Sequence, residues 1–264
     1  MPRPAPLLPR LRVVLTAGGT REPIDDVRHV SNVASGSLPA ALADVLLARG
    51  AEVHYIHGPG ARLPGRVALD VEVLGLPADA LNQKLVAWTQ AAERARAAMA
   101  AGELTLHPIE TAQQAAETLA RVVASVQPQL VACAMAVADF APVARTGKLP
   151  SHTAELTIRM LPTPKAIDGV KPAHPGCRLL GFKLLSGASE AELRDAALHL
   201  CQRSGADLVF GNDIKDYRAG RRRGLLLGPS GDVLERLDGG SGADAQVRLA
   251  EQLVAAVLAE ITRE

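Results

Sequence analysis

The sequence predicts an α/β fold of the Rossmann-like type, with a mostly parallel central sheet, helices on both faces and an antiparallel terminal hairpin. Three observations predict it. Short apolar runs alternate with helical patterns along most of the chain, as in successive βαβ units. The first apolar run ends in a glycine turn that leads to a helix. Two runs near the end, 224–228 and 233–237, flank the turn Pro229-Ser230-Gly231-Asp232, a pattern typical of antiparallel strands.

Length and composition set the limits of the fold. The chain has 264 residues, of which 48% are apolar and 2% aromatic. This is enough for one large α/β domain or two small ones, with cores of leucine, valine and alanine. The formal net charge is +1, so we expect neither nucleic acid nor an anionic membrane as a partner. No apolar run reaches the roughly 18 residues of a membrane span. The proline-rich residues 1–10 are expected to be a flexible lead-in.

The first βα unit carries the features of an anion site. Its strand ends in Gly18-Gly19-Thr20, and its helix, 38–49, follows Ser35-Gly36-Ser37, of which either serine can serve as the N-cap. Glycines allow backbone N–H groups to approach a ligand, and a helix N-terminus carries a partial positive charge. Arg21 and Arg28 in the connecting loop can bind phosphate or carboxylate. The alternative is an ordinary βα loop with solvated arginines.

The spacing of the glycines argues against a nicotinamide-dinucleotide site. Gly19 and Gly36 are 17 positions apart, whereas the dinucleotide fingerprint places its glycines close together between strand and helix. The second strand ends in His57-Gly58, without the Asp or Glu that holds a ribose hydroxyl. A Walker-type GxxxxGK[ST] motif is also missing. An NAD(P)-dependent oxidoreductase of Rossmann type therefore remains only as an alternative.

Periodicity predicts the other elements, with apolar or alternating runs for strands and 3.6-residue repeats for helices. Capping boxes mark two helix starts, Thr111 with Gln114 and Ser189 with Glu192. Trp88 lies on an apolar stripe of its helix and is interpreted as a packing or subunit-contact residue. In chain order we expect strands at 13–15, 51–57 and 68–74, a helix at 77–102, a strand at 104–107, a helix at 111–127, strands at 130–134 and 155–160, a short helix starting at 164–167, a strand at 178–185, a helix at 189–204, a strand at 207–210 and a final helix at 243–262.

Polar residues follow two later strands. The strand at 130–134 is followed by small residues and then Asp139, which is typical of a strand end that faces a ligand. This carboxylate can accept a sugar hydroxyl, a base amino group or a hydrated Mg²⁺, and capping a turn is the alternative. Asn212 follows a later strand in the same way. The loop 143–152 is polar and expected to be mobile; its one lysine, Lys148, is by itself typical of a solvated loop.

Two other groups of residues are given structural interpretations. Cys133, Cys177 and Cys201 lack CxxC spacing, which indicates reduced thiols in a cytoplasmic protein without a disulfide framework or zinc site. Arg218 and the run Arg221-Arg222-Arg223 can form a phosphate patch, but a solvated hairpin tip is the favoured interpretation.

The segment GGTREPIDDVRHVSN, followed after two residues by SG, closely resembles the bacterial phosphopantothenate–cysteine ligases, the amide-forming enzymes of coenzyme A synthesis. The segments GKLPS, LPTPKAI, GFK and GNDI continue the resemblance, which extends over nearly the whole chain from residue 11. It is weakest over 60–102, which is interpreted as a partly helical insertion. The resemblance implies that residues 1–264 are a single ligase domain. GKLPS resembles the stand-alone form of the ligase rather than the form fused to a decarboxylase.

The resemblance implies an ATP- or CTP-dependent ligase that joins 4'-phosphopantothenate to L-cysteine through an acyl-nucleotidylate, giving 4'-phosphopantothenoylcysteine. Asn32 resembles the residue that contacts the acyl end of the intermediate, and its amide is expected to stabilise developing oxyanion charge. Lys148 resembles the flap lysine that reaches the nucleotide phosphates. Arg28 can fix the same carboxylate, which makes Asn32, Lys148 and Arg28 the expected catalytic residues. Arg28, Asn32 and Asn212 are the expected substrate-binding residues. The family also implies a cytoplasmic homodimer, and a catalytically inactive nucleotide-binding regulator is the remaining alternative.

The resemblance also implies a nucleotide site, which includes the glycine turn and the helix start. Mg²⁺ is expected mainly on the nucleotide phosphates, with Asp139 as the candidate protein ligand. Relatives carry two helix lysines where this chain has Leu200 and Ser204, so the choice between CTP and ATP stays open. The expected nucleotide-binding residues are Gly18, Gly19, Thr20, Ser35, Gly36, Met135, Asp139, Pro164, Lys165, Ala166, Ile167 and Phe182.

Overall fold

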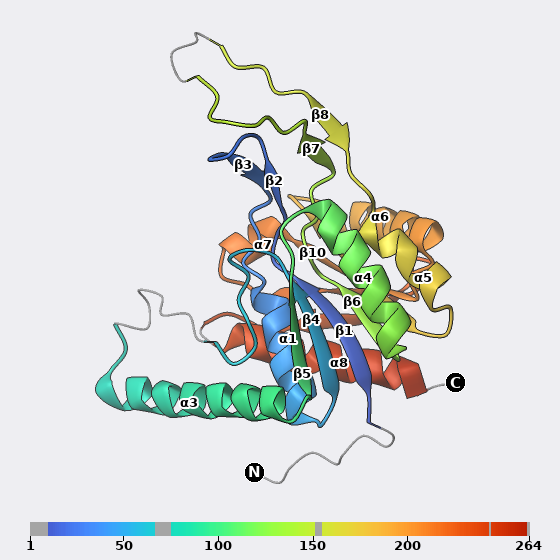
Figure 1. Ribbon diagram of the computed structural model, residues 1–264. Coiled ribbons are helices and arrows are strands. Elements are labelled where there is room, and N and C mark those ends of the chain that lie inside the picture. Colours follow the sequence, from blue (N-terminus) through green and yellow to red (C-terminus); the bar gives the residue numbers. More distant parts are fainter. Residues whose placement is uncertain (1–9, 67–74, 151–154, 243, 263–264) are drawn as a thin grey trace.

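The computed structural model describes residues 10–66, 75–150, 155–242 and 244–262. Their centre is an eight-stranded sheet in the order β12-β11-β10-β9-β6-β1-β4-β5. Figure 1 shows this sheet with β1, β4, β5, β6 and β10 labelled. Six of these strands are parallel, and the last two form the antiparallel hairpin that the sequence predicts. The strands are β1 (Arg12–Ala17), β4 (Glu52–His57), β5 (Leu104–Pro108), β6 (Leu130–Cys133), β9 (Arg178–Leu185), β10 (Leu208–Asp213), β11 (Arg223–Leu227) and β12 (Val233–Asp238).

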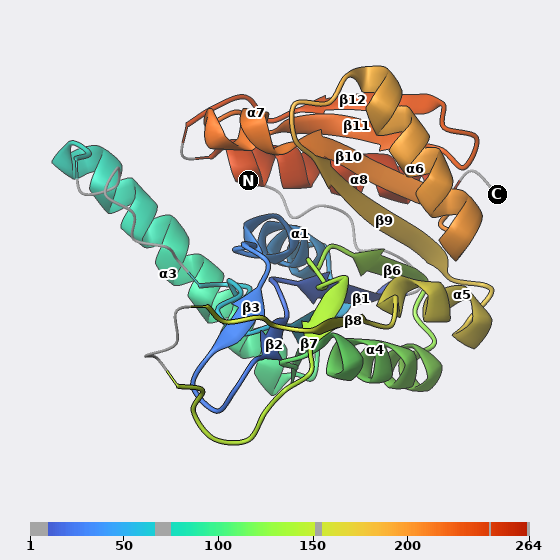
Figure 2. The ribbon, with the colours of Figure 1, turned by 90° about the horizontal axis from the view of Figure 1, so that it is seen from above.

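Helices cover both faces of the sheet, which confirms the predicted Rossmann-like α/β fold. Helices α1 and α8 lie on one face, and α4, α5 and α6 lie on the other (Figure 2). The helices are α1 (Ser37–Ala48), α4 (Ala112–Val126), α5 (Val170–Ala173), α6 (Glu190–Ser204) and α8 (Ala245–Thr262).

Strand β1 is buried on both faces because its side chains alternate between them. Val13 and Leu15 belong to the core cluster on the α1 and α8 side. Val14 belongs to the second cluster, together with Leu119 of α4 and Ala197 of α6. The strand therefore needs a continuous apolar run. Because β1 lies inside the sheet, the glycine turn that follows it lies among the carboxyl ends of the parallel strands.

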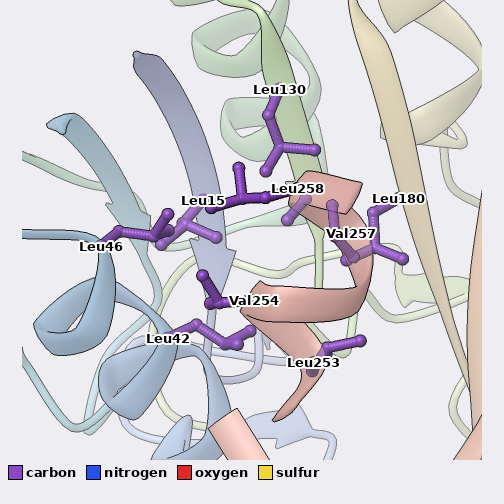
Figure 3. A pocket seen from close by; sticks show the side chains of 10 residues that line it. Leu15, Leu42, Leu46, Leu130, Leu180, Leu253, Val254, Val257 and Leu258 are labelled. Carbon is purple, nitrogen blue, oxygen red and sulfur yellow. The ribbon is translucent and has the colours of Figure 1, made fainter. Parts of the chain in front are cut away.

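A small apolar cavity lies in the core on the α1 and α8 side (Figure 3). Leucine, valine and alanine side chains line it, among them Leu15 of β1, Leu42 of α1 and Val254 of α8. Its volume is about 10 Å³, which is far too small for a nucleotide, and its lining offers no polar group to bind one. The cavity is a packing void of the core.

Most predicted helices and strands are confirmed. The capping boxes of α4 and α6 are present, with Thr111 and Ser189 as N-caps. Strand β9 has the predicted bounds. Strand β10 is longer than predicted and ends at Asp213, and the short helix α7 (Ile214–Arg218) follows it. The strand predicted at 68–74 lies outside the described residues.

Three local predictions are wrong. Gly36, with φ of +67°, is the N-cap of α1 in place of a serine, since glycine adopts this conformation readily. The chain between β1 and α1 holds the hairpin β2–β3 rather than loop alone. The strand predicted at 155–160 is replaced by β8, which pairs with β7 outside the main sheet. Long-range pairing decides such short strands, and local periodicity does not report it. The four short strands are β2 (Arg21–Pro23), β3 (His29–Ser31), β7 (Phe140–Pro142) and β8 (Met160–Pro162).

The helix predicted at 77–102 is α3 (Ala78–Ala100), which projects from the sheet (Figure 1). Within this helix Ala95 and Ala98 are buried, whereas Leu85 is 44% exposed and Trp88 is half-buried. The predicted apolar stripe is therefore covered only toward the end of the helix. No helix in the described part of the chain combines the length and the apolar character that crossing a membrane requires.

Candidate functional site

The strand order points to a crevice between β1 and β6. Strands β4 and β5 extend the sheet on one side of β1, and β6, β9 and β10 extend it on the other. In parallel α/β sheets, ligands bind at the carboxyl ends of the strands where the order reverses in this way. Two predicted ligand-binding segments, residues 18–20 and 135–139, directly follow β1 and β6.

Backbone hydrogen bonds join these two segments. The N–H of Ala136 donates to the carbonyl of Gly18 over 2.8 Å, and the N–H of Thr20 donates to the carbonyl of Ala136 over 3.4 Å. A β-carbon at Gly19 would lie 2.6 Å from the carbonyl oxygen of Asn32, so no larger residue fits without a shift of the backbone. We call this pairing of residues 18–20 with residue 136 the glycine seam.

Asn32 lies beside the glycine seam. Its amide nitrogen donates to the carbonyl oxygens of Ala136 over 3.3 Å and of Val137 over 3.2 Å. The residue is exposed, and its amide oxygen accepts no hydrogen bond from the residues that the structure describes. The amide oxygen is therefore the atom that Asn32 presents to a ligand, and the amide N–H groups expected to stabilise an oxyanion donate to these carbonyls instead.

The start of α1 forms another wall of the site. The N–H of Arg62 donates to the carbonyl of Ser35 over 2.9 Å, and a β-carbon at Gly36 would lie 3.1 Å from the backbone of the glycine seam. The hydroxyl of Ser37 lies 3.2 Å from that of Tyr217, within hydrogen-bond distance. Burial raises the pKa of Tyr217, but hydrogen bonds with Ser37 and Ser35 outweigh it, so the net pKa lies below its usual value. The hydroxyl of Tyr217 thus contacts the start of α1, where the sequence predicts anion binding.

Asp139 and Lys165, both predicted to bind the nucleotide, form an ion pair. Their side chains are 74% and 39% exposed. The N–H of Thr163 donates to the carbonyl of Asp139 over 3.1 Å, and the exposed Pro164 leads into the short helix η1 (Ala166–Gly169). Among the described residues, no group of three or more His, Cys, Asp or Glu side chains is placed to hold a metal ion.

Lys148 is exposed, in a segment that is bound to the turn after β2. We call residues 145–149 the flap segment and residues 24–28 the Asp25 turn. Arg28 lies in this turn and forms an ion pair with Asp25 over 2.6 Å. The structure thereby brings the segments of Arg28 and Lys148 together. The bonds between the two segments are Arg145 N–H to the Ile24 carbonyl (3.1 Å), Gly147 N–H to the Asp26 carboxylate (3.0 Å), Leu149 N–H to the Asp25 carboxylate (3.0 Å) and the Arg28 guanidinium to the Leu149 carbonyl (3.2 Å).

Several residues predicted to bind the nucleotide or the substrate belong to different faces and strands of the sheet. Phe182 packs with the core cluster on the α1 and α8 side, with its ring centroid 5.8 Å from that of a second phenylalanine. Met135, Ala166 and Ile167 pack against the cluster on the opposite face. Asn212 lies in β10, which β9 separates from β6. Phe182 thus lies on the strand next to β6, and Asn212 lies one strand further along the sheet.

Sequence reasoning missed three residues that hold the site together: Glu22, Asp25 and Tyr217. Glu22 is buried, and its carboxylate accepts the N–H of Ala112 at the start of α4 over 2.8 Å. Tyr217 reaches the start of α1 from a helix late in the chain. Only Asp25 leaves a local signal, because its carboxylate accepts two N–H groups of its own turn, as Asp does in Asx turns.

The arginine run near the terminal hairpin is bound within the protein. Arg221 and Arg223 each form an ion pair with Asp216 over 2.7 Å. The guanidinium carbon of Arg222 lies 3.9 Å from the ring centroid of Tyr217, a cation–π contact. These arginines are thus neither an unpaired phosphate patch nor a merely solvated tip.

The cysteine nearest the site is a structural residue. Burial raises the pKa of Cys133 to about 12, so its thiol stays neutral and is a poor nucleophile. Cys133, Cys177 and Cys201 are all free in the described part of the chain.

The chain matches one protein-family model, the DNA/pantothenate metabolism flavoprotein C-terminal domain, over residues 8–76 and 91–224. The unmatched stretch between them includes the first part of α3.

Curated relatives include coenzyme A biosynthesis bifunctional proteins CoaBC. The chain is 30% identical over 217 residues to that of Thermococcus kodakarensis, a match covering 82% of this chain and 45% of the relative. It is 30% identical over 222 residues to that of Escherichia coli K12, covering 81% of this chain and 43% of the relative. The chain thus spans less than half the length of these relatives.

Two solved structures share the fold. The DNA/pantothenate metabolism flavoprotein from Streptococcus pneumoniae superposes with a TM-score of 0.71 at 22% identity, covering 95% of this chain and 99% of that one. A Cab2 mutant in complex with phosphopantothenate-cysteine superposes with a TM-score of 0.75 at 20% identity, covering 95% and 86%. At these identities the likeness concerns the fold, and the family match decides the membership. The chain belongs to the DNA/pantothenate metabolism flavoprotein C-terminal domain family.

Proposed function

We propose that this chain is a ligase that uses ATP or CTP to join 4'-phosphopantothenate to L-cysteine, giving 4'-phosphopantothenoylcysteine in coenzyme A biosynthesis. The family, the relatives named for coenzyme A biosynthesis and the relative in complex with phosphopantothenate-cysteine support this reaction. The observation that carries the proposal is the position of Asn32, whose amide lies beside the glycine seam where the strand order reverses.

In the first step, the carboxylate of 4'-phosphopantothenate attacks the α-phosphorus of the nucleotide. An acyl-nucleotidylate forms and pyrophosphate leaves. Both reactants are anions, so the site must supply positive charge and N–H donors that are already in place. The start of α1 supplies backbone N–H groups and a partial positive charge. Lys148 on the flap segment and Lys165 after β8 supply cations for the phosphates.

In the second step, the amine of cysteine attacks the acyl carbon. The new C–N bond replaces the C–O bond to the phosphate, the nucleoside monophosphate leaves, and the amine loses a proton. Because the Asn32 amide nitrogen is bonded to two backbone carbonyls, its oxygen accepts an N–H of the attacking amine and orients it. Arg28 binds the carboxylate of phosphopantothenate with the guanidinium nitrogens that Asp25 and Leu149 do not engage.

Mg²⁺ and the nucleotide are the other expected partners. The carboxylate of Asp139 is already paired with Lys165, and the described residues contain no cluster of ligands. Mg²⁺ would therefore be bound mainly by the nucleotide phosphates, whose charge it would neutralise. At the positions of the missing helix lysines, Leu200 packs into the core and the Ser204 hydroxyl donates to the Leu200 carbonyl over 2.7 Å. These two positions thus offer the nucleotide no cation, and the neighbouring Arg203 is paired with Asp168 over 3.5 Å. CTP and ATP are therefore to be compared directly.

The proposal includes a homodimer in the cytoplasm, with residues 1–264 as one ligase domain. The stretch that the family model leaves unmatched, 77–90, is shorter than the insertion expected at 60–102. Large apolar side chains stand exposed on the β7–β8 ribbon, among them Phe140, at 53% exposed, and Leu161, at 46%. Exposed apolar patches are typical of protein interfaces. The free cysteines agree with a reducing compartment. Light scattering should give the mass of two chains, and a single-chain mass would contradict this part of the proposal.

Pyrophosphate release tests the proposed function. The purified chain is assayed with CTP or ATP, each with and without phosphopantothenate and cysteine. We expect release that requires phosphopantothenate but not cysteine, and amide formation that requires both. Absence of release with either nucleotide would overturn the ligase assignment and favour an inactive nucleotide-binding regulator. Tight binding of NAD(P)H in a fluorescence titration would favour the oxidoreductase instead.

A further inference from the structure

The carboxylate of Asp25 is completely shielded from solvent, although it lies in a surface turn. Its Oδ1 accepts the backbone N–H groups of Val27 (2.9 Å) and Arg28 (2.8 Å). Its Oδ2 accepts Nη1 of Arg28 (2.6 Å) and the backbone N–H of Leu149 (3.0 Å). The two oxygens thus have separate partners: Oδ1 closes the turn, and Oδ2 reaches the Arg28 guanidinium and the flap segment.

Leu149 is held at both of its backbone polar groups. Its N–H donates to Asp25, and its carbonyl accepts Nη1 of Arg28 over 3.2 Å. The Asp25–Arg28 ion pair therefore bonds with both the N–H and the carbonyl of Leu149, more than 120 positions away in the sequence. A neighbouring strand in a sheet would engage the same two groups. Lys148 is the preceding residue, and the N–H that Asp25 accepts belongs to the peptide bond between Lys148 and Leu149, so this bond also restrains the backbone of Lys148.

We infer that Asp25 is a positioning residue, which holds the Lys148 segment and the Arg28 guanidinium in place with one carboxylate. This inference rests on the proposed function, in which Lys148 meets the nucleotide phosphates and Arg28 meets the phosphopantothenate carboxylate. Asp25 touches neither substrate. It acts through two other residues, and it couples their positions because the same oxygen binds both of their segments.

The electrostatics agree with this role. The pKa of Asp25 is lowered to about 2, and the N–H of Leu149 is the largest cause, followed by burial, which opposes it, and by the bonds from Val27 and Arg28. The carboxylate is therefore ionised throughout the working pH range. Hydrogen bonds to an ionised acceptor are stronger than neutral ones.

The substitution Asp25→Asn distinguishes the two roles of the carboxylate, which are closing the turn through Oδ1 and binding Arg28 and Leu149 through Oδ2. The amide oxygen can still accept the N–H groups of Val27 and Arg28 and so keep the turn. The amide nitrogen replaces Oδ2 and faces two donors, which removes the bonds to the flap segment. Asp26→Asn is the matched control, because Asp26 lies next in the chain, is exposed and accepts a single flap N–H, that of Gly147.

The first measurement is independent of the reaction. Amide hydrogen exchange at Leu149 and tryptic cleavage after Lys148 both report the attachment of the flap segment. We expect the exchange rate and the cleavage rate to rise by about tenfold or more in Asp25→Asn, and by less than about threefold in Asp26→Asn. Equal rates in Asp25→Asn and the parent protein, or equal effects of the two variants, would overturn the inference.

The second measurement is pyrophosphate release. With Lys148 displaced, we expect kcat in Asp25→Asn to fall by about tenfold or more, while the KM for nucleotide changes by less than about threefold. Faster exchange with unchanged kcat would overturn the positioning role. A parent protein without any pyrophosphate release would instead overturn the proposed function, and the exchange data alone would still decide whether the attachment exists.

A second pair of variants covers the case in which Asp25→Asn does not fold. Leu149→Pro removes the donating N–H without touching the turn, and Leu149→Ala keeps that N–H. We expect Leu149→Pro to reproduce the loss of kcat and Leu149→Ala to retain most of it. Equal activity of these two variants would overturn the inference.

Discussion

The glycine seam and the flap segment are the two sides of the candidate site, and they are held in different ways. At the glycine seam, backbone groups of Gly18, Thr20 and Ala136 bind one another, and the space left admits no side chain at Gly19. The flap segment is attached largely through side chains, those of Asp25, Asp26 and Arg28. The comparison teaches that the glycine seam requires residues without a side chain, whereas the flap segment requires a few specific side-chain hydrogen bonds. Substitutions should therefore damage the two sides differently.

The largest expected effect comes from a substitution in the flap segment, which should lower the reaction rate without changing stability. Lys148→Gln should lower the rate of pyrophosphate release by about 10²–10³-fold, because a cation facing the developing charge is lost. The free energy of unfolding should not change, since Lys148 is exposed. Asn32→Ala should fail later, with pyrophosphate released but little amide formed.

Arg145→Gln is the matched control for Lys148→Gln, because Arg145 is exposed in the same segment and takes part in its attachment through the backbone. It should retain most of the activity. If Arg145→Gln and Lys148→Gln were equally slow, general loss of positive charge would explain the result better than a specific contact of Lys148.

On the seam side, Gly19→Ala should damage fold and activity together. The added β-carbon would lie 2.6 Å from a backbone oxygen that cannot rotate away, and such overpacking typically costs about 1–3 kcal/mol of stability. Urea unfolding measures this loss. Gly169→Ala is the control, since no atom lies within 4 Å of a β-carbon there. Equal stability of the two variants would show that the seam can relax.

The carboxyl of Asp44 in α1 offers a test that depends on pH. Asp44 accepts the N–H of Gly65 over 2.8 Å, and burial raises its pKa to about 6, opposed by that hydrogen bond and by Arg94. A folded pKa above the unfolded value of 3.8 favours the fold below about pH 4, and this contribution is lost as the pH rises through about 6. Asp44→Asn should therefore stabilise the protein by about 2 kcal/mol at pH 8.

The same substitution should change stability little at pH 4, where the folded carboxyl is protonated. Denaturant unfolding at the two pH values gives the comparison. A gain of equal size at both pH values would mean that ionisation of Asp44 is not its cause. Asp44→Ala, which also removes the acceptor for Gly65, should be the less stable variant at both.

The smallest effect is expected where the start of α1 meets α7. Tyr217→Phe removes the hydroxyl that bonds with Ser37, and should cost about 1 kcal/mol of stability. Ser37→Ala should cost a similar amount, and the double variant should cost less than the sum of the two. Strict additivity in thermal unfolding would show that the two hydroxyls do not stabilise each other.

The sequence specified those features that depend on neighbouring residues. The apolar run of β1, the capping boxes at Thr111 and Ser189 and the turn of the terminal hairpin are short-range patterns, and each appears where it is predicted. The βα alternation predicted the parallel sheet, and hence a site at the carboxyl ends of its strands. The motif from Gly18 to Gly36 was located for the same reason, because it lies within one βα unit.

Tertiary structure alone decided what joins distant parts of the chain. Nothing local in the sequence indicates that Asp25 binds Leu149, that Tyr217 reaches Ser37, or that Glu22 accepts the first N–H of α4. The short strands β7 and β8 exist only because they pair with each other, so the strand predicted at 155–160 was placed wrongly. The physical reason is range: a cap or a strand period involves a few adjacent residues, whereas these contacts require the whole chain to be folded first.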